Sequence, residues 1–185
     1  EGSSESIDIV DAYVDRLVQG FAGGAFRIGW DAGNGAAGTV IEKLTARLPR
    51  EHHLLFTAID GHFPNHHPDP SDPANLEDLI HAVKQTGADL GIAFDGDGDR
   101  LGVVSRTGEI IYPDRLLMLF ARDVLSRQPG GIVIYDVKCT SHLKGQILDA
   151  GGSPLMWRTG RSLIKAKIRE KSAELAGEMS GHFFF

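Results

Sequence analysis

The sequence predicts an α/β protein of two consecutive domains, each a mixed, mainly parallel sheet with covering helices. Apolar strand-like runs alternate with helix-like segments through the first hundred residues, and such alternation is typical of parallel sheets. The alternation begins again at residues 131–137, after a hairpin-like segment at residues 101–113. We therefore assign residues 1–109 to a first domain and residues 110–185 to a second.

The first domain is expected to contain three helices and three strands before the hairpin. The periodicity of the apolar residues, with the glycines and prolines between them, predicts each element. Helices are expected at residues 6–20, 39–48 and 74–87, and strands at residues 26–31, 53–60 and 88–94. The third helix should turn four apolar side chains inward, namely Leu76, Leu79, Ile80 and Val83.

The second domain follows a hairpin that turns at Arg106–Gly108. Its first helix should end where a proline and two glycines occur together. Helices are expected at residues 114–131, 141–152 and 161–172, strands at residues 131–137 and 153–157, and an extended segment at residues 174–185. This second series resembles the first in the order of its elements.

The composition of the 185 residues is that of an ordinary globular protein, with 42% hydrophobic and 24% charged residues. A net charge of -6 argues against general nucleic-acid binding, and no apolar run approaches the ~20 residues that cross a membrane. The single cysteine, Cys139, excludes an internal disulfide and fits a cytoplasmic location. The start EGSSES and the end GHFFF suggest a piece of a longer protein.

The stretch GIAFDGDGDRLGVV predicts a metal site, because Asp95, Asp97 and Asp99 alternate with glycines directly after an apolar run. Three carboxylates this close repel one another, and a hard cation such as magnesium, manganese or calcium would relieve that repulsion. Arg100 adds a fork of donors suited to phosphate. An EF-hand loop is excluded, since its sixth and twelfth positions are Arg100 and Arg106 here.

Two other motifs have alternative interpretations. Residues Gly33–Gly38, GNGAAG, match a dinucleotide-binding pattern, but a tight turn that needs glycine for close backbone approach explains them better. His62, His66 and His67 crowd one loop and suggest zinc, but the prolines between and after them favour a stiff surface loop.

Polar residues also follow the strands of the second domain, in the stretches DVKCT, WRTGRS and GEMSGH. Ligands of α/β sheets bind at the carboxyl ends of strands, so these side chains should converge there. Lysine and arginine suit a phosphate, glutamate and serine suit sugar hydroxyls, and histidine suits proton transfer or phosphate contact. The candidates are Lys138, Arg161, Ser162, Glu178, Ser180 and His182.

These motifs together resemble the α-D-phosphohexomutases, a family that includes bacterial phosphomannomutase/phosphoglucomutases. The resemblance rests on GIAFDGDGDRLGVV, FPNHHPDP, IIYPDRLLMLFARDV, DVKCT and GEMSGHFFF, and it extends from about residue 8 to the end. It implies an enzyme of four domains, of which this chain would be the second and most of the third. The first and fourth domains would be missing partners, and the substrate would be a phosphorylated hexose, with mannose and glucose both open.

The resemblance also implies roles for individual residues. Asp95, Asp97 and Asp99 would hold Mg²⁺, with a phosphoserine of the first domain as a further ligand. Arg100 would lie beside the transferring phosphoryl group. Glu178 and Ser180 would bind sugar hydroxyls, while Lys138 and His182 would lie near the reacting hydroxyl and phosphate. At Arg161, which precedes Ser162, close relatives carry histidine.

Three classes of function remain at this point. The first is one part of a reversible hexose 1-phosphate and 6-phosphate mutase, inactive without its missing domains. The second is a haloacid-dehalogenase-like phosphatase with Asp95 as nucleophile, although that motif wants threonine or valine where Asp99 stands. The third is a dinucleotide-binding module that uses Gly33–Gly38.

Overall fold

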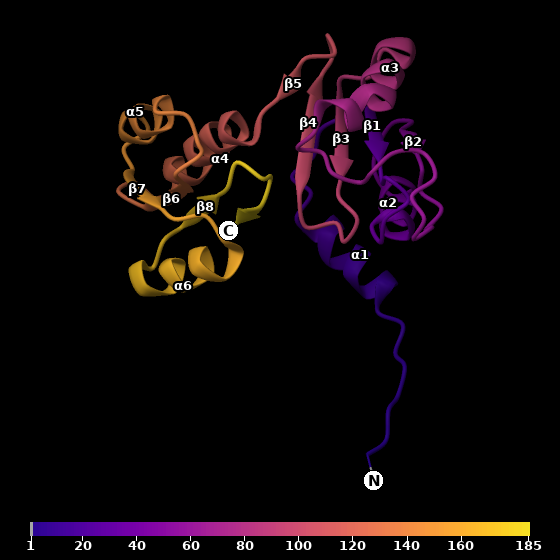
Figure 1. Cartoon of the computed structure of the whole chain (residues 1–185), viewed down its shortest axis with the longest axis horizontal. Helices are drawn as coiled ribbons and strands as arrows, with labels where there is room; N and C mark the ends of the chain where they lie inside the picture. Colours follow the sequence, from indigo (N-terminus) through magenta and orange to yellow (C-terminus); the bar gives the residue numbers. More distant parts are fainter. Residues whose placement is uncertain (1) are drawn as a thin grey trace.

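The computed structural model describes residues 2–185 and contains two mixed sheets with helices on both faces of each, as the sequence predicts. Figure 1 shows the sheets in separate halves of the molecule, joined by the segment between β5 and α4. Within residues 2–185, no helix is long and apolar enough to cross a membrane.

The first sheet has the strand order β2-β1-β3-β4-β5. Strand β1 lies between β2 and β3 and pairs in parallel with both, while β4 and β5 are antiparallel. The strands are β1 (Ile28–Asp31), β2 (His53–Leu55), β3 (Leu90–Phe94), β4 (Leu101–Ser105) and β5 (Ile110–Ile111). The helices are α1 (Val10–Gln19), α2 (Gly38–Thr45), the 3-10 turn η1 (Pro73–Leu76) and α3 (Glu77–Thr86).

The second sheet has the strand order β7-β6-β8-β9, with β6 parallel to β7 and β8, and with β9 antiparallel. It therefore repeats the order of the first four strands of the first sheet. The strands are β6 (Ile132–Asp136), β7 (Ser153–Trp157), β8 (Leu175–Gly177) and β9 (Phe183–Phe184). The helices are α4 (Pro113–Arg127), α5 (His142–Asp149) and α6 (Arg161–Lys171).

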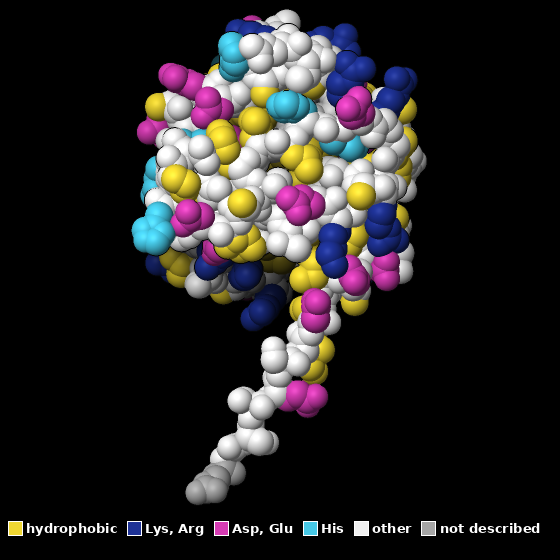
Figure 2. All heavy atoms as spheres, turned by 90° about the vertical axis from the view of Figure 1, so that its right-hand side faces the viewer, with side chains coloured by type: hydrophobic (Ala, Val, Ile, Leu, Met, Phe, Trp, Pro, Cys, Tyr) yellow, Lys and Arg dark blue, Asp and Glu magenta, His cyan; other side chains and the backbone are white. Residues whose placement is uncertain are grey.

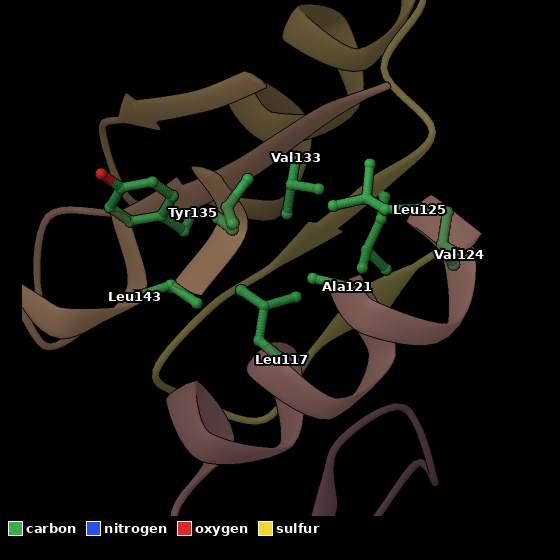
Figure 3. Close-up of a cluster of buried hydrophobic side chains, with 9 residues drawn as sticks. Leu117, Ala121, Val124, Leu125, Val133, Tyr135 and Leu143 are labelled. Atoms are coloured by element: carbon green, nitrogen blue, oxygen red, sulfur yellow. The ribbon is translucent and has the colours of Figure 1, made fainter. Parts of the chain in front are cut away.

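Each half has its own apolar core. In Figure 3, Leu117 and Leu125 of α4 point toward Val133 of β6, and Leu143 of α5 closes one end of the cluster. In the first half, Leu76, Leu79 and Val83 are fully buried and Ile80 packs beside them, so the predicted inward face is confirmed. Burial of each large aliphatic side chain stabilises the fold by about 1.5–3 kcal/mol.

Several expected elements are shorter in the structure, including the helices expected at residues 6–20 and 114–131, which begin at Val10 and end at Arg127, respectively. The strand expected over residues 53–60 ends at Leu55, because Phe56 has a positive φ of 53° that breaks the extended backbone. The extended segment expected over residues 174–185 is instead a tight antiparallel pair, β8 and β9, joined by a loop at residues 178–182. That loop carries several of the candidate site residues.

One face of the first half is shown in Figure 2, which is turned by 90° from Figure 1. Acidic and basic side chains are interspersed over this face. It therefore carries no continuous basic stripe of the kind that nucleic-acid-binding proteins use.

Candidate metal and substrate site

The aspartate loop leaves the carboxyl end of β3 and returns into β4. Asp95, Asp97 and Asp99 each offer a carboxylate oxygen, and these atoms all lie within 4.8 Å of one another. Asp95 is only 3% exposed, whereas Asp97 and Asp99 are open to solvent. A set of three oxygen donors with no nitrogen or sulfur fits a hard divalent cation better than zinc.

Asp95 also fixes the shape of this loop. Its Oδ1 accepts hydrogen bonds from the backbone N–H groups of Asp99 at 2.9 Å and Arg100 at 3.0 Å. Its Oδ2 accepts a hydrogen bond from Nε of Arg100 at 2.6 Å. Both oxygens are thus engaged by the loop itself, which argues against Asp95 as the exposed nucleophile of a phosphatase.

Arg100 is held by two carboxylates. Besides its bond to Asp95, its Nη1 donates to Oδ1 of Asp69 at 2.9 Å, and its side chain is 26% exposed. Burial alone would lower the pKa of Arg100, but the hydrogen bond and charge of Asp95 and the charge of Asp69 raise it. The guanidinium is therefore a fixed positive charge with donors still free for an anion.

The loops of the second sheet are organised by Asp136, which is fully buried at the end of β6. Its carboxylate accepts hydrogen bonds from the Lys138 backbone N–H at 3.1 Å, the Cys139 thiol at 3.3 Å and the Thr159 hydroxyl at 3.0 Å. Nζ of Lys138 lies 3.8 Å from Asp136 Oδ2. Burial, followed by the charge of Asp136, raises the pKa of Cys139, which disfavours the reactive thiolate form.

The loop after β8 carries Glu178, Ser180 and His182. Glu178 is only 2% exposed, and its Oε1 accepts a hydrogen bond from the Gly160 N–H at 2.7 Å. Nδ1 of His182 lies 2.8 Å from the Ser180 hydroxyl and 3.3 Å from Glu178 Oε2. Burial is the main cause that lowers the pKa of His182; Glu178 opposes it, and the charges of Arg100 and Arg161 add to it.

The aspartate loop and the loop after β8 touch each other. The backbone N–H of Leu101 donates to the carbonyl of Gly181 at 3.0 Å, and Nε2 of His182 lies 3.1 Å from Asp99 Oδ1. Arg161, at the start of α6, forms an ion pair with Asp99 as well. Of the residues expected to converge, Arg161, Glu178, Ser180 and His182 therefore lie together in one cluster beside Asp99.

Lys138 and Ser162 occupy different places relative to this cluster. Lys138 and Ser180 line a cavity of about 270 Å³ between the two halves, together with Ser71 and Tyr112. Ser162 is exposed in the first turn of α6. The structure thus brings Lys138 to the same cavity as Ser180, and it leaves Ser162 on the surface.

The glycine motif forms the tight turn that was favoured over a nucleotide site. Gly33 and Asn34 have positive φ values of 53° and 58°. A Cβ on Gly35 would lie 2.8 Å from the carbonyl oxygen of Gly96, and one on Gly38 would overlap the carbonyl oxygen of Thr57. These glycines therefore allow the backbone to pack closely against other backbone.

The three histidines do not form a metal site. His62 is almost fully exposed and pairs with Asp60, whereas His66 turns inward and pairs with the buried Asp31. The expectation of a stiff surface loop is only partly right, because Pro68 and Pro70 are buried. Sequence reasoning also missed Asp31 and Asp136; each is the last residue of an apolar strand, which is the one signal that could have found them.

The chain is similar to known proteins along its whole length. Residues 11–108 match phosphoglucomutase/phosphomannomutase alpha/beta/alpha domain II, and residues 112–185 match domain III of the same family. The chain belongs to this family. A phosphomannomutase/phosphoglucomutase of Pseudomonas putida is 56% identical over all 185 residues, and a crystal structure of a family protein from Burkholderia thailandensis is 57% identical with a TM-score of 0.94.

The relatives also place the chain within a longer sequence. It spans 40% of the Pseudomonas putida protein. The structural match includes 98% of this chain and 40% of the Burkholderia thailandensis chain. An Aspergillus fumigatus N-acetylphosphoglucosamine mutase, solved in complex with GlcNAc-6P and magnesium, is 15% identical with a TM-score of 0.66. That match covers 94% of this chain and 38% of the fungal one, and at this identity it shows the fold alone.

Proposed function

We propose that this chain is the metal- and sugar-binding part of a phosphohexomutase that interconverts hexose 1-phosphate and hexose 6-phosphate. The observation that carries the proposal is the contact of two loops from different sheets, in which Asp99 of the aspartate loop meets His182 of the loop after β8. A phosphoryl group held by the first loop and a sugar held by the second would therefore be adjacent.

Residues of the aspartate loop are assigned to the phosphoryl group. Asp95, Asp97 and Asp99 would hold Mg²⁺, which when bound supplies positive charge to the transferring phosphate. Arg100 is fixed by Asp95 and Asp69 and keeps donors free for phosphate oxygens.

Residues of the second half are assigned to the sugar phosphate. Ser180 and Lys138 line one cavity and would contact a sugar hydroxyl and a phosphate, respectively. Arg161 and Ser162 open α6 and would complete the substrate side, while His182 would exchange a proton with the reacting hydroxyl. Glu178 is buried against Gly160 in this structure, so contact with sugar hydroxyls requires that loop to open.

The proposed reaction moves a phosphoryl group in two steps. A phosphoserine from another part of the enzyme gives its phosphoryl group to the free hydroxyl of the hexose phosphate. The hydroxyl oxygen bonds to phosphorus as the bond from phosphorus to the serine oxygen breaks. The bisphosphate then reorients in the site, and its other phosphoryl group is transferred back to the serine. Charge stabilisation by Arg100 would be the main contribution of this chain, since phosphoryl transfer depends chiefly on electrostatics.

We also propose the domain assignment that the sequence suggests. Residues 1–109 form the metal-binding domain, and residues 110–185 form most of the sugar-binding domain. The relatives are about two and a half times as long as the matched chain, so first and fourth domains would complete the enzyme. Its substrate would be glucose or mannose phosphate, and its location cytoplasmic.

A chimera tests this function. The matched 40% of the Pseudomonas putida relative is replaced by residues 1–185, and conversion of mannose 1-phosphate and glucose 1-phosphate to the 6-phosphates is measured beside the parent enzyme. We expect turnover by the chimera, none by the 185 residues alone, and a kcat about thirtyfold or more lower in Arg100→Ala. A folded chimera without turnover, or an Arg100→Ala kcat within about threefold, would contradict the proposal.

A further inference from the structure

The proline-rich loop at residues 61–73 carries Asp69, one of the two carboxylates that hold Arg100, and it packs against the aspartate loop. Pro68 and Pro70 are both buried. A Cβ on Gly96 would lie 3.4 Å from the Pro68 ring, and a Cβ on Gly102 would lie 2.6 Å from the Pro70 ring. The two prolines therefore lie directly on the backbone of the aspartate loop and of β4, with Asp69 between them.

Asp69 reaches the guanidinium of Arg100 from this position. Its Oδ1 accepts a hydrogen bond from Arg100 Nη1 at 2.9 Å, across 31 residues of sequence. The same oxygen accepts from the Ser71 backbone N–H at 3.0 Å and from the Ser71 hydroxyl at 2.7 Å. Burial would raise the pKa of Asp69, but the Ser71 hydrogen bonds and the charge of Arg100 outweigh burial and lower it, so the carboxylate is charged at neutral pH.

We propose that Asp69 is a positioning residue that fixes the plane of the Arg100 guanidinium for phosphoryl transfer, an inference that rests on the proposed function. Asp95 alone holds the guanidinium only through Nε, so the guanidinium could still rotate about that hydrogen bond. The second carboxylate, at Nη1, removes this freedom. A guanidinium has five N–H donors, so the other Nη1 hydrogen and both Nη2 hydrogens remain for phosphate oxygens.

The loop that carries Asp69 is well suited to this task because it is anchored at both ends. On one side His66 pairs with the buried Asp31, with Nε2 3.1 Å from Oδ2, and its Nδ1 lies 3.0 Å from the His67 carbonyl. On the other side Asn75 donates to the Asp69 carbonyl at 2.9 Å. Prolines further restrict the backbone between these anchors. Asp69 therefore cannot follow Arg100 if the arginine moves.

If Asp69 acted only locally, as the cap of the turn at Ser71, its substitution would not affect Arg100. Asp72 has the same kind of local role in the same loop, since its Oδ1 accepts the Ala74 N–H at 3.0 Å. Its hydrogen bonds do not include Arg100. Asp72→Asn is therefore a matched control for Asp69→Asn, with the same change of charge at the same kind of turn contact.

The first experiment follows the Arg100 Nε–Hε signal by ¹⁵N NMR in the 185-residue chain, and it does not depend on mutase activity. We expect Asp69→Asn to shift and weaken this signal while Asp72→Asn leaves it unchanged. Thermal unfolding of both variants shows that each is folded. An unchanged Arg100 signal in a folded Asp69→Asn variant, or equal effects of the two variants, would overturn the proposal.

The second experiment measures turnover in the chimera with the Pseudomonas putida relative. We expect Asp69→Asn to lower kcat by about tenfold or more with little change in KM, because misplacing a catalytic group by about 1 Å is that damaging. In an Arg100→Ala background the same change should have no further effect, since Asp69 acts through Arg100. A kcat loss that is equally large in both backgrounds would overturn the inference; a parent chimera without turnover would instead count against the proposed function.

Discussion

Arg161→Ala should strengthen cation binding by the aspartate loop. In this structure the Arg161 guanidinium forms an ion pair with Asp99, one of the three carboxylates gathered for a cation. A cation at the loop must compete with that guanidinium for the same oxygens. Removing the guanidinium removes the competitor and leaves the three carboxylates in place.

The size of the effect follows from the exposure of the pair. The Arg161 side chain is 51% exposed and that of Asp99 is 31% exposed, so the pair lies near the surface. Exposed ion pairs contribute about 0.2–1 kcal/mol, which corresponds to an increase in cation affinity of about 1.4- to 5-fold. His182, 3.1 Å from the same carboxylate, stays in the variant.

The assay is calorimetric titration of the chain with magnesium at an ionic strength of about 0.15 M, where the Debye length is about 8 Å. Arg158→Ala is the matched control, because Arg158 is an exposed arginine three residues away that lies over the Trp157 ring. Its loss removes the same charge from the same segment without touching Asp99. Weaker magnesium binding by Arg161→Ala, or equal gains in both variants, would refute the competition.

Three further predictions concern the metal, the glycine turn and a buried carboxylate. Asp97→Asn should weaken magnesium binding without loss of stability, because Asp97 is exposed; calorimetry and thermal unfolding measure the two effects. Gly38→Ala should lower the free energy of unfolding in urea by about 2 kcal/mol, because its Cβ would overlap a backbone carbonyl, whereas Gly61→Ala meets nothing within 4 Å and serves as control. Burial raises the pKa of Asp31 above 3.8, and His66→Ala should raise it further in NMR titrations, because His66 lowers this pKa. Since the folded pKa lies above the unfolded one, the contribution of Asp31 to stability rises as pH falls through the folded pKa.

The elements of the fold could be predicted because their signals are local. The inward face of Leu76, Leu79 and Val83 follows from helical spacing, and the hairpin of β4 and β5 follows from a short glycine-containing turn. The convergence of the aspartates also follows from spacing alone, since three carboxylates at alternate positions, separated by glycines, lie close together in a short loop.

The supports of the site could not be predicted, because they join residues far apart in sequence. Asp69 meets Arg100 across 31 residues, and Asp31 meets His66 across 35. Glu178 illustrates the same limit: its motif suggests a ligand of sugar hydroxyls, yet the fold buries it against the Gly160 N–H, 18 residues earlier. Pairing of this kind depends on how the sheets bring loop ends together, and periodicity carries no information about it.

The repeated strand order explains why the two loops can serve one site. In each sheet the strand with two parallel neighbours, β1 or β6, ends in a fully buried aspartate, Asp31 or Asp136, whose Oδ1 accepts the N–H two residues later. In each, the strand beside it is followed directly by a buried acid, Asp95 or Glu178, that bonds to backbone N–H groups.

Two copies of one scaffold thus position two different loops, and only the residues beyond the buried acid distinguish the proposed metal loop from the proposed sugar loop. Their relative placement then depends on the few contacts between them, the Leu101–Gly181 hydrogen bond and the contacts that Asp99 makes with His182 and Arg161. Since Asp99 is also a proposed metal ligand, a cation that draws this carboxylate inward would loosen the same contacts that hold the halves together. Occupancy of the metal loop and the opening of the loop after β8, which Glu178 needs to reach a sugar, are therefore expected to be coupled through this one side chain.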